Sequence, residues 1–347
     1  MEWLRLAIEA DRSAGWQAWS ETFDTLFNNW QLAACRQLLQ LLKSNDEIAA
    51  SDPGKAVLVC AAEGMFLARL SCWEEAAKVY WQALATVREY GRPEDRAWLL
   101  SNLGSIHYLA GKYEAAQQAY TEALTLYRDL DHLPGQALCH NNLSNLAAEA
   151  DKRQVAIEHL RAALEIFRTL EDAAGQAIAL NNLANLWQLN GEWAAARSCY
   201  MEALTIYESQ RDLYGQAEVL GNLGLLVLNQ GDPETAITYF IRDLALASEI
   251  GNRHSLSETL NNLAIAYRQL GQIEEALTYY ERSLTLKREL GDRRGELITL
   301  ANMCRLHLQQ AHSEAFEECR ALASAIAQSL GDHEALAMLA QMNSLKQ

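Results

Sequence analysis

The segment NNLANLWQLNGEWAAARSCYMEAL, residues 181–204, returns in altered form every 40 residues along the chain. Its second residue belongs to a column of six asparagines in register, without insertion or deletion: Asn102, Asn142, Asn182, Asn222, Asn262 and Asn302. Each is followed by leucine or, at Met303, by methionine. A fixed period of this length indicates stacked supersecondary units, so the chain is predicted to be a solenoid rather than a globule with one central core.

Other columns keep the same period. A small residue stands two places after each asparagine: Gly104, Ser144, Ala184, Gly224, Ala264 and Cys304. Further along stand a ring or leucine (Tyr120, Leu160, Tyr200, Phe240, Tyr280) and then a leucine (Leu124, Leu164, Leu204, Leu244, Leu284). Spacings of three and four between apolar columns indicate helices. Glycine or aspartate breaks the pattern twice in each unit, so each unit is predicted to hold two helices.

Seven units starting near residues 53, 93, 133, 173, 213, 253 and 293 account for residues 53–332. The four prolines fall at the breaks: Pro53, Pro93, Pro134 and Pro233. Residues 333–347 are predicted to form a C-terminal capping helix, because terminal units need a polar outer face. Residues 1–52 are rich in tryptophan and off-register. They are interpreted either as an N-terminal helical cap or degenerate repeat, or as an aromatic docking surface.

The columns resemble the signature of the tetratricopeptide repeat. One unit shows the signature at Leu183, Ala184, Trp187, Gly191, Trp193, Ala196, Tyr200 and Ala203. The familiar repeat has about 34 residues. The 40-residue form, with its recurrent NNLA or NLG and the loop 291–295, is similar to the kinesin light chain and the Pins/LGN spindle adaptors. This resemblance implies an all-α fold: a right-handed α-α superhelix of about seven helix-turn-helix repeats with helical caps at both ends.

Composition excludes several classes of function. Half of the residues are hydrophobic (50%), which is enough for a buried interior, but no apolar run approaches the roughly 18 residues of a membrane span. The net charge of −16 disfavours nucleic acid, whose phosphates require a basic face. The start, MEWLRLAIEADR, does not read as a signal peptide, and the seven cysteines form no CxxC pair. We therefore expect a cytoplasmic protein with reduced thiols and no membrane insertion.

The asparagines lie away from the predicted core. If Leu103 is position 7 of its helix, the core columns are positions 4, 7, 8 and 11, and the asparagine at position 6 lies roughly 150° from their centre. Positions 2, 9 and 13 share its stripe and vary from unit to unit, whereas position 6 does not. In tetratricopeptide arrays the equivalent stripe lines the concave groove, and the resemblance implies that an asparagine here holds the backbone of a bound peptide.

Two uses of the asparagine amide remain open, and they can coexist. The structural use is a hydrogen bond between adjacent first helices. The functional use is a ladder of amides that bind an extended peptide backbone. In the second case the neighbouring groove residues would set specificity. The candidate partner-binding residues that accompany the six asparagines are Asn145, Asn185, Trp98, Tyr108, Arg268 and Arg305.

Two arginines are too few for a clamp on an acidic C-terminal tail, so we expect a neutral or basic partner. No GxGxxG, GxxxxGK[ST], GxSxG or HExxH motif is present, and Ala337 stands where the second histidine of a zinc-protease motif would follow His333-Glu334. We therefore expect no catalytic residues, no metal site and no cofactor.

The sequence favours an adaptor or scaffold that binds a peptide segment of a partner protein in the concave groove. One alternative is a peptide-responsive regulator whose superhelix changes shape when ligand binds. Another is a constitutive subunit of a larger complex, with a possible homodimer through the N-terminal region. An enzyme is not expected.

Overall fold

The computed structural model describes residues 22–23, 31–43, 53–90 and 92–344, and the regular structure in these ranges is entirely α-helical. In the described residues before the repeats lies helix α3 (Leu32–Lys43). The first helices of the repeats are α5 (Pro53–Arg69), α7 (Pro93–Leu109), α9 (Leu133–Glu149), α11 (Ala173–Leu189), α13 (Leu213–Asn229), α15 (Arg253–Gln269) and α17 (Arg293–Gln309). The second helices are α6 (Trp73–Tyr90), α8 (Tyr113–Asp129), α10 (Arg153–Thr169), α12 (Trp193–Gln210), α14 (Pro233–Ile250), α16 (Ile273–Leu290) and α18 (Ser313–Leu330). A final helix, α19, spans His333–Ser344.

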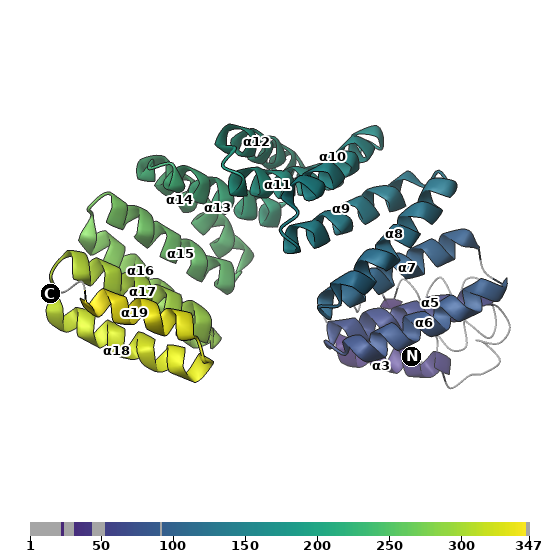
Figure 1. Cartoon of the computed structure of the whole chain (residues 1–347), viewed down its shortest axis with the longest axis horizontal. Coiled ribbons are helices and arrows are strands. Elements are labelled where there is room, and N and C mark those ends of the chain that lie inside the picture. Colours follow the sequence, from purple (N-terminus) through teal and green to yellow (C-terminus); the bar gives the residue numbers. More distant parts are fainter. Residues whose placement is uncertain (1–21, 24–30, 44–52, 91, 345–347) are drawn as a thin grey trace. The chain divides into compact units, whose positions relative to one another are not determined.

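The all-α class and the consecutive helix pairs predicted from the sequence are confirmed, and the pairs can be followed in Figure 1. The chain divides into two compact units, Met1–Asp172 and Ala173–Gln347. The first unit contains α3 and α5–α10, and the second contains α11–α19. The sequence period does not mark this division, because the columns run through it without a change.

The turns between helices repeat their backbone conformation every 40 residues. A residue with positive φ follows each helix of a pair except α6, after which residue 91 is not described. It is glycine at seven of these sites: Gly111, Gly191, Gly231, Gly251, Gly271, Gly291 and Gly331. Aspartate or asparagine often follows as the cap of the next helix. The Asp212 carboxylate accepts from the amide of Gly215 at 3.1 Å, for example, and Asn252 Oδ1 accepts from the amide of Ser255 at 3.1 Å. These caps satisfy amides that a helix start leaves unpaired.

Close approach of the two helices in a repeat depends on the small-residue column. A Cβ added at Gly104 would lie 2.7 Å from the ring of Tyr120, and one added at Gly224 would lie 2.3 Å from the ring of Phe240. The rings themselves are almost fully buried, with 2% of Tyr120 and 0% of Phe240 exposed. Burying a side chain of this size contributes roughly 1.5–3 kcal/mol. The small column therefore lets the rings become the core of each pair.

Within each unit the first helices of successive repeats lie against one another. In the first unit α7 contacts both α5 and α9, and in the second α13 contacts α11 and α15, which in turn contacts α17. The first helices therefore form a face in each unit on which the asparagine stripe lies. No described helix combines the length and apolarity that a membrane span requires.

The N-terminal predictions fall largely outside the described residues. Trp3, Trp16, Trp19 and Trp30 all lie there, so the choice between a cap and an aromatic docking surface stays a prediction. The same holds for a homodimer through this region. Among the described residues before the repeats, helix α3 packs against α5.

Candidate functional site

The six asparagines at position 6 are all half-buried on their first helices. Two of them join adjacent repeats. Asn222 Nδ2 donates to Asn181 Oδ1 at 3.2 Å, and Asn302 Nδ2 donates to Asn261 Oδ1 at 3.3 Å. The acceptor in each case is the asparagine at position 5 of the preceding repeat. The structural use of the amide is therefore real at these two sites.

The other asparagines behave differently. Asn102 Nδ2 bonds within its own helix, to the carbonyl of Trp98 at 2.8 Å, and Asn182 also has a partner within the chain. Asn142 and Asn262 have no hydrogen-bond partner among the described residues. The reason is the residue at position 5 of the preceding repeat, which supplies the acceptor for Asn222 and Asn302. For Asn142 this residue is Ser101, and for Asn262 it is Gly221, so neither offers a side-chain amide oxygen.

The remaining candidate residues lie on the same face but are partly engaged. The Tyr108 hydroxyl donates to Glu149 Oε1 at 3.4 Å, and Arg268 Nη1 donates to Gln309 Oε1 at 3.3 Å. Both bonds run from position 12 of one repeat to position 13 of the next. Three others are also engaged: Asn185 accepts from the Tyr200 hydroxyl, Arg305 Nη2 lies 3.3 Å from Met338 Sδ, and Trp98 packs partly into the core. Asn145 is half-buried, with no partner among the described residues.

Exposed apolar side chains accompany the asparagines at positions 2 and 13. In the first unit they are Leu109 (54% exposed) and Leu138 (48%). In the second unit they are Ile178 (47%), Leu189 (63%) and Ile298 (51%). Large apolar side chains that recur along one face offer contact area to another chain. The face is thus an alternation of amides and apolar groups, which suits a segment of extended polypeptide better than a small polar solute.

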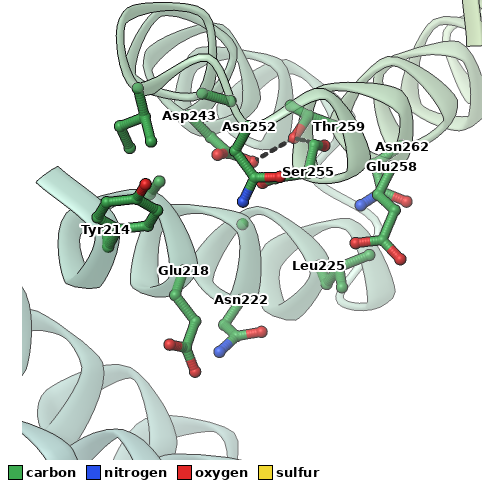
Figure 2. A pocket seen from close by; sticks show the side chains of 14 residues that line it. Tyr214, Glu218, Asn222, Leu225, Asp243, Asn252, Ser255, Glu258, Thr259 and Asn262 are labelled. Atoms are coloured by element: carbon green, nitrogen blue, oxygen red, sulfur yellow. Dashed lines mark hydrogen bonds between the residues drawn. The ribbon is translucent and has the colours of Figure 1, made fainter. Parts of the chain in front are cut away.

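A pocket of about 350 Å³ opens between α13 and α15 in the second unit, with part of α14 behind it. Figure 2 shows Asn222 and Asn262 at this pocket together with Glu218 and Glu258. Two members of the asparagine column thus meet at one cavity. Sequence reasoning located the asparagines but not the cavity, because a cavity depends on the gap that side chains of two repeats leave between them.

Asp243 on α14 lines the pocket, although only 4% of the residue is exposed to solvent. Its Oδ2 accepts from the Thr259 hydroxyl at 2.7 Å, and its Oδ1 has no hydrogen-bond partner. Burial raises the pKa of Asp243 to about 6; the Thr259 hydrogen bond opposes this rise, and the nearby Glu258 adds to it. A buried carboxylate that lacks a partner is costly, so its presence calls for a reason.

The unusual residue Asp243 could have been found from the sequence, by comparison with its column in the other repeats. The corresponding residues of the other repeats are Ala83, Ala123, Ala163, Ala203, Ser283 and Ala323. An aspartate in a column of small residues is a local departure from the repeat. Comparing every core column across the units, and not only the asparagine column and its stripe, would have found it.

A second buried polar cluster lies in the first unit. His140 Nδ1 lies 2.9 Å from His159 Nδ1, and Arg128 Nη2 lies 3.4 Å from His140 Nε2. Burial lowers the pKa of His140 to about 4, and the charges of His159 and Arg128 add to this effect. Both ring nitrogens of His140 are engaged by these neighbours. The described residues contain no group of three or more His, Cys, Asp or Glu side chains that could hold a metal ion.

Changing each asparagine to alanine should affect the free energy of unfolding differently at bonded and unbonded positions. Asn222→Ala and Asn302→Ala each remove an inter-repeat hydrogen bond and should lower the free energy of unfolding by about 1 kcal/mol. Asn142→Ala and Asn262→Ala remove no such bond, and alanine favours helix by up to about 0.7 kcal/mol. These two variants should therefore be as stable as the parent or slightly more stable in urea unfolding. Equal destabilisation by all four changes would contradict this assignment.

Asp243→Ala should stabilise the protein at pH 7. The folded pKa of Asp243, about 6, lies above the ordinary 3.8. The side chain therefore lowers the stability of the fold least below pH 3.8, and it lowers that stability fully once the pH has risen through 6. The gain should be roughly 1–3 kcal/mol at pH 7, since one pKa unit is worth about 1.4 kcal/mol. It should shrink as the pH falls from 6 to 4.

Thermal or urea unfolding across that pH range measures the effect. Glu249→Ala is the matched control, because it removes an exposed carboxylate from the same helix. Asp243→Ala showing no gain at pH 7, or a gain that does not depend on pH, would show that the buried carboxylate carries no such cost.

Comparison with known proteins agrees with the geometry. The family model described as "Tetratricopeptide repeat" matches residues 58–129, 135–209, 215–289 and 255–318. No curated protein matches the chain.

Three solved structures share the fold at low identity. BtubC (BKLC) from P. vanneervenii is 22% identical, with 63% of this chain and 92% of that chain covered and a TM-score of 0.58. A Rap protein complexed with Competence and Sporulation Factor is 18% identical, with 95% and 96% covered and a TM-score of 0.59. The signal transduction ATPase PH0952 from Pyrococcus horikoshii, which has a tetratricopeptide repeat sensor, is 12% identical, with 87% and 45% covered and a TM-score of 0.72. With the repeat columns, the helix pairs and the family match in agreement, this chain belongs to the tetratricopeptide repeat family.

Proposed function

We propose that this chain is a protein-interaction adaptor that binds an extended segment of another protein along the first helices of its repeats. One observation carries the proposal: Asn142 and Asn262 keep the asparagine of the column although neither has a partner within the described part of the chain. Asparagine is a poor helix residue, so an amide without an internal bond needs another use. A bound backbone would supply that use.

The chemistry of the amide suits this role. A side-chain amide carries both a donor and an acceptor, so it bonds the N–H and C=O groups of an extended chain whatever its side chains are. Such contacts give affinity without demanding a sequence. Specificity then falls to the variable positions. Leu109 and Leu138 in the first unit would take apolar groups, whereas Glu218 and Glu258 in the second unit favour positive charge.

The partner that fits this surface is neutral or basic. The protein carries a net charge of −16, which opposes an acidic ligand. Arg268 and Arg305 are each engaged by a neighbour, Gln309 and Met338 respectively, and they stand 37 residues apart in sequence on different helices. They do not form the converging cluster that an acidic C-terminal carboxylate needs. The cytoplasmic location and the homodimer remain predictions from the sequence.

A peptide-responsive regulator is the second candidate function. It is favoured by the proteins that share the fold, since one is a Rap protein complexed with Competence and Sporulation Factor and another carries its tetratricopeptide repeats as a sensor. These properties belong to those proteins, and their identity to this chain is low. An adaptor and a regulator would use the same first-helix face, and they differ in whether binding changes the shape of the array.

Selection from a displayed library of random peptides should enrich ligands for the purified chain. The double variant Asn142→Ala/Asn262→Ala should weaken their binding by about fivefold, whichever unit a peptide occupies, because the amide lost from that unit removes a contact worth about 1 kcal/mol. Isothermal titration calorimetry measures the affinity, and circular dichroism checks that helicity is unchanged. The exposed pair Gln118→Ala/Glu249→Ala, on second helices, is the control and should bind as the parent does.

Two results would count against the adaptor. One is a library from which no peptide is enriched. The other is a set of peptides that bind the double asparagine variant and the parent equally well. A synthetic peptide with an acidic C-terminal tail should not bind at micromolar concentration, and binding of that peptide would overturn the expected charge of the partner.

Small-angle X-ray scattering with and without an enriched peptide should distinguish the two candidates. An adaptor should keep its radius of gyration within error, because the bonds between successive repeats already hold the first helices together. A regulator should become more compact or more extended when peptide is added. A change in shape that depends on the asparagines would replace the adaptor with the regulator as the better description.

A further inference from the structure

The pocket between α13 and α15 results from two departures from the repeat that occur opposite each other. The first is Asp243, in a column where five other repeats have alanine and one has serine. The second is Gly221, in a column otherwise filled by Ala61, Ser101, Asn141, Asn181, Asn261 and Ala301. A Cβ added at Gly221 would lie 3.2 Å from Asp243 Oδ2, which is a tight contact. The glycine therefore leaves room for the Asp243 carboxylate against α13.

The cavity is large enough for the end of a long side chain. Its volume of about 350 Å³ compares with roughly 30 Å³ for a water molecule in the liquid. Asp243 is 4% exposed, so the carboxylate sits at the inner end of the cavity and not on the surface. An occupant that reaches it must be both long and narrow.

One oxygen of the Asp243 carboxylate lacks a hydrogen-bond donor. Thr259 already serves Oδ2, and Oδ1 has no partner. The charged residues that line the pocket are Asp243, Glu218 and Glu258, and no lysine or arginine lines it. A positively charged donor would therefore supply the hydrogen bond that Asp243 Oδ1 lacks and would offset the negative charge of the three carboxylates.

The asparagine column leads to the same place. Asn222 and Asn262 both line the pocket, from α13 and α15 respectively. A peptide whose backbone is held by the Asn262 amide would pass over the mouth of the cavity. A side chain of that peptide is then close to the opening, without any further rearrangement of the chain.

We propose that this pocket takes a lysine or arginine side chain of the bound peptide, whose cationic group donates to Asp243 Oδ1 at the inner end. The inference rests on the proposed function, since the peptide brings the side chain to the pocket. It adds a basic anchor to a ligand that the amides alone would leave undefined in sequence. Glu218 and Glu258 at the mouth attract the same charge.

Binding should depend on pH. A cation favours the ionised form of Asp243, so the complex loses stability as the pH falls below the free pKa of about 6. The other titratable groups at the pocket are Tyr214 and Glu218 on α13 and Glu258 on α15, and His254 on α15 lies 3.7 Å from Glu258. Affinity should fall by up to about tenfold between pH 7 and pH 5 because of Asp243. In Asp243→Ala this fall should be absent or much smaller.

The test uses the same random-peptide library on three forms of the full chain. Peptides selected by the parent and by the control Glu249→Ala should share one lysine or arginine position. Peptides selected by Asp243→Ala should lose that preference and still depend on Asn262. A selected peptide in which norleucine replaces the basic residue should bind the parent about tenfold or more weaker, and should bind Asp243→Ala no more weakly than the basic peptide does.

The outcomes separate the two proposals. If no peptide is enriched, the proposed function fails and this inference fails with it. If peptides are enriched without a common basic position, or if Asp243→Ala keeps the preference, the inference fails and the proposed function stands. Calorimetric titration of the parent with spermidine, Ca²⁺ or Zn²⁺ alone should show no binding that Asp243→Ala abolishes. Such binding would assign the pocket to a free cation in place of a peptide side chain.

Discussion

The contact between a small residue on the first helix and a ring on the second holds five of the seven repeats together; Leu160 and Arg320 replace the ring in the other two. At Gly104 and Gly224 a Cβ would fall within 3 Å of Tyr120 and Phe240, so the helices are as close as a glycine permits. The buried rings supply much of the apolar interior of each pair. Because the contact recurs every 40 residues, every first helix presents the same face to solvent. The asparagines therefore lie on corresponding faces of the first helices.

A repeat array leaves function to the positions that the packing does not use. The core columns are nearly uniform because each must fit the same neighbour, whereas positions 2, 9 and 13 vary freely. Asp243 and Gly221 are exceptions of another kind, since they lie in columns that packing does control. The first places a carboxylate where burial is costly, and the second leaves room for that carboxylate. We expect a cost in stability at this repeat, which is the pattern that a retained ligand site would explain.

Much of the fold was predictable from the sequence, and less of the site. The spacing of the columns indicates two helices per unit because apolar side chains three and four residues apart share one helical face. The division into two units was not predictable, since the columns do not change at Asp172. For the site, the stripe was predictable from helical geometry. The different states of Asn222 and Asn262 were not, because each depends on the residue that a neighbouring repeat brings within 3.5 Å.

The sequence by itself determined the period, the helix pairs and the helix faces, because these depend on local spacing and on the conformations that glycine and capping residues allow. Only the tertiary structure decided which amides are satisfied within the chain, and that a pocket lies between α13 and α15. Hydrogen bonds and cavities depend on distances of a few tenths of an ångström between residues about 40 apart in sequence, such as Asn181 and Asn222. A column alignment shows which residues correspond, but not which of them touch.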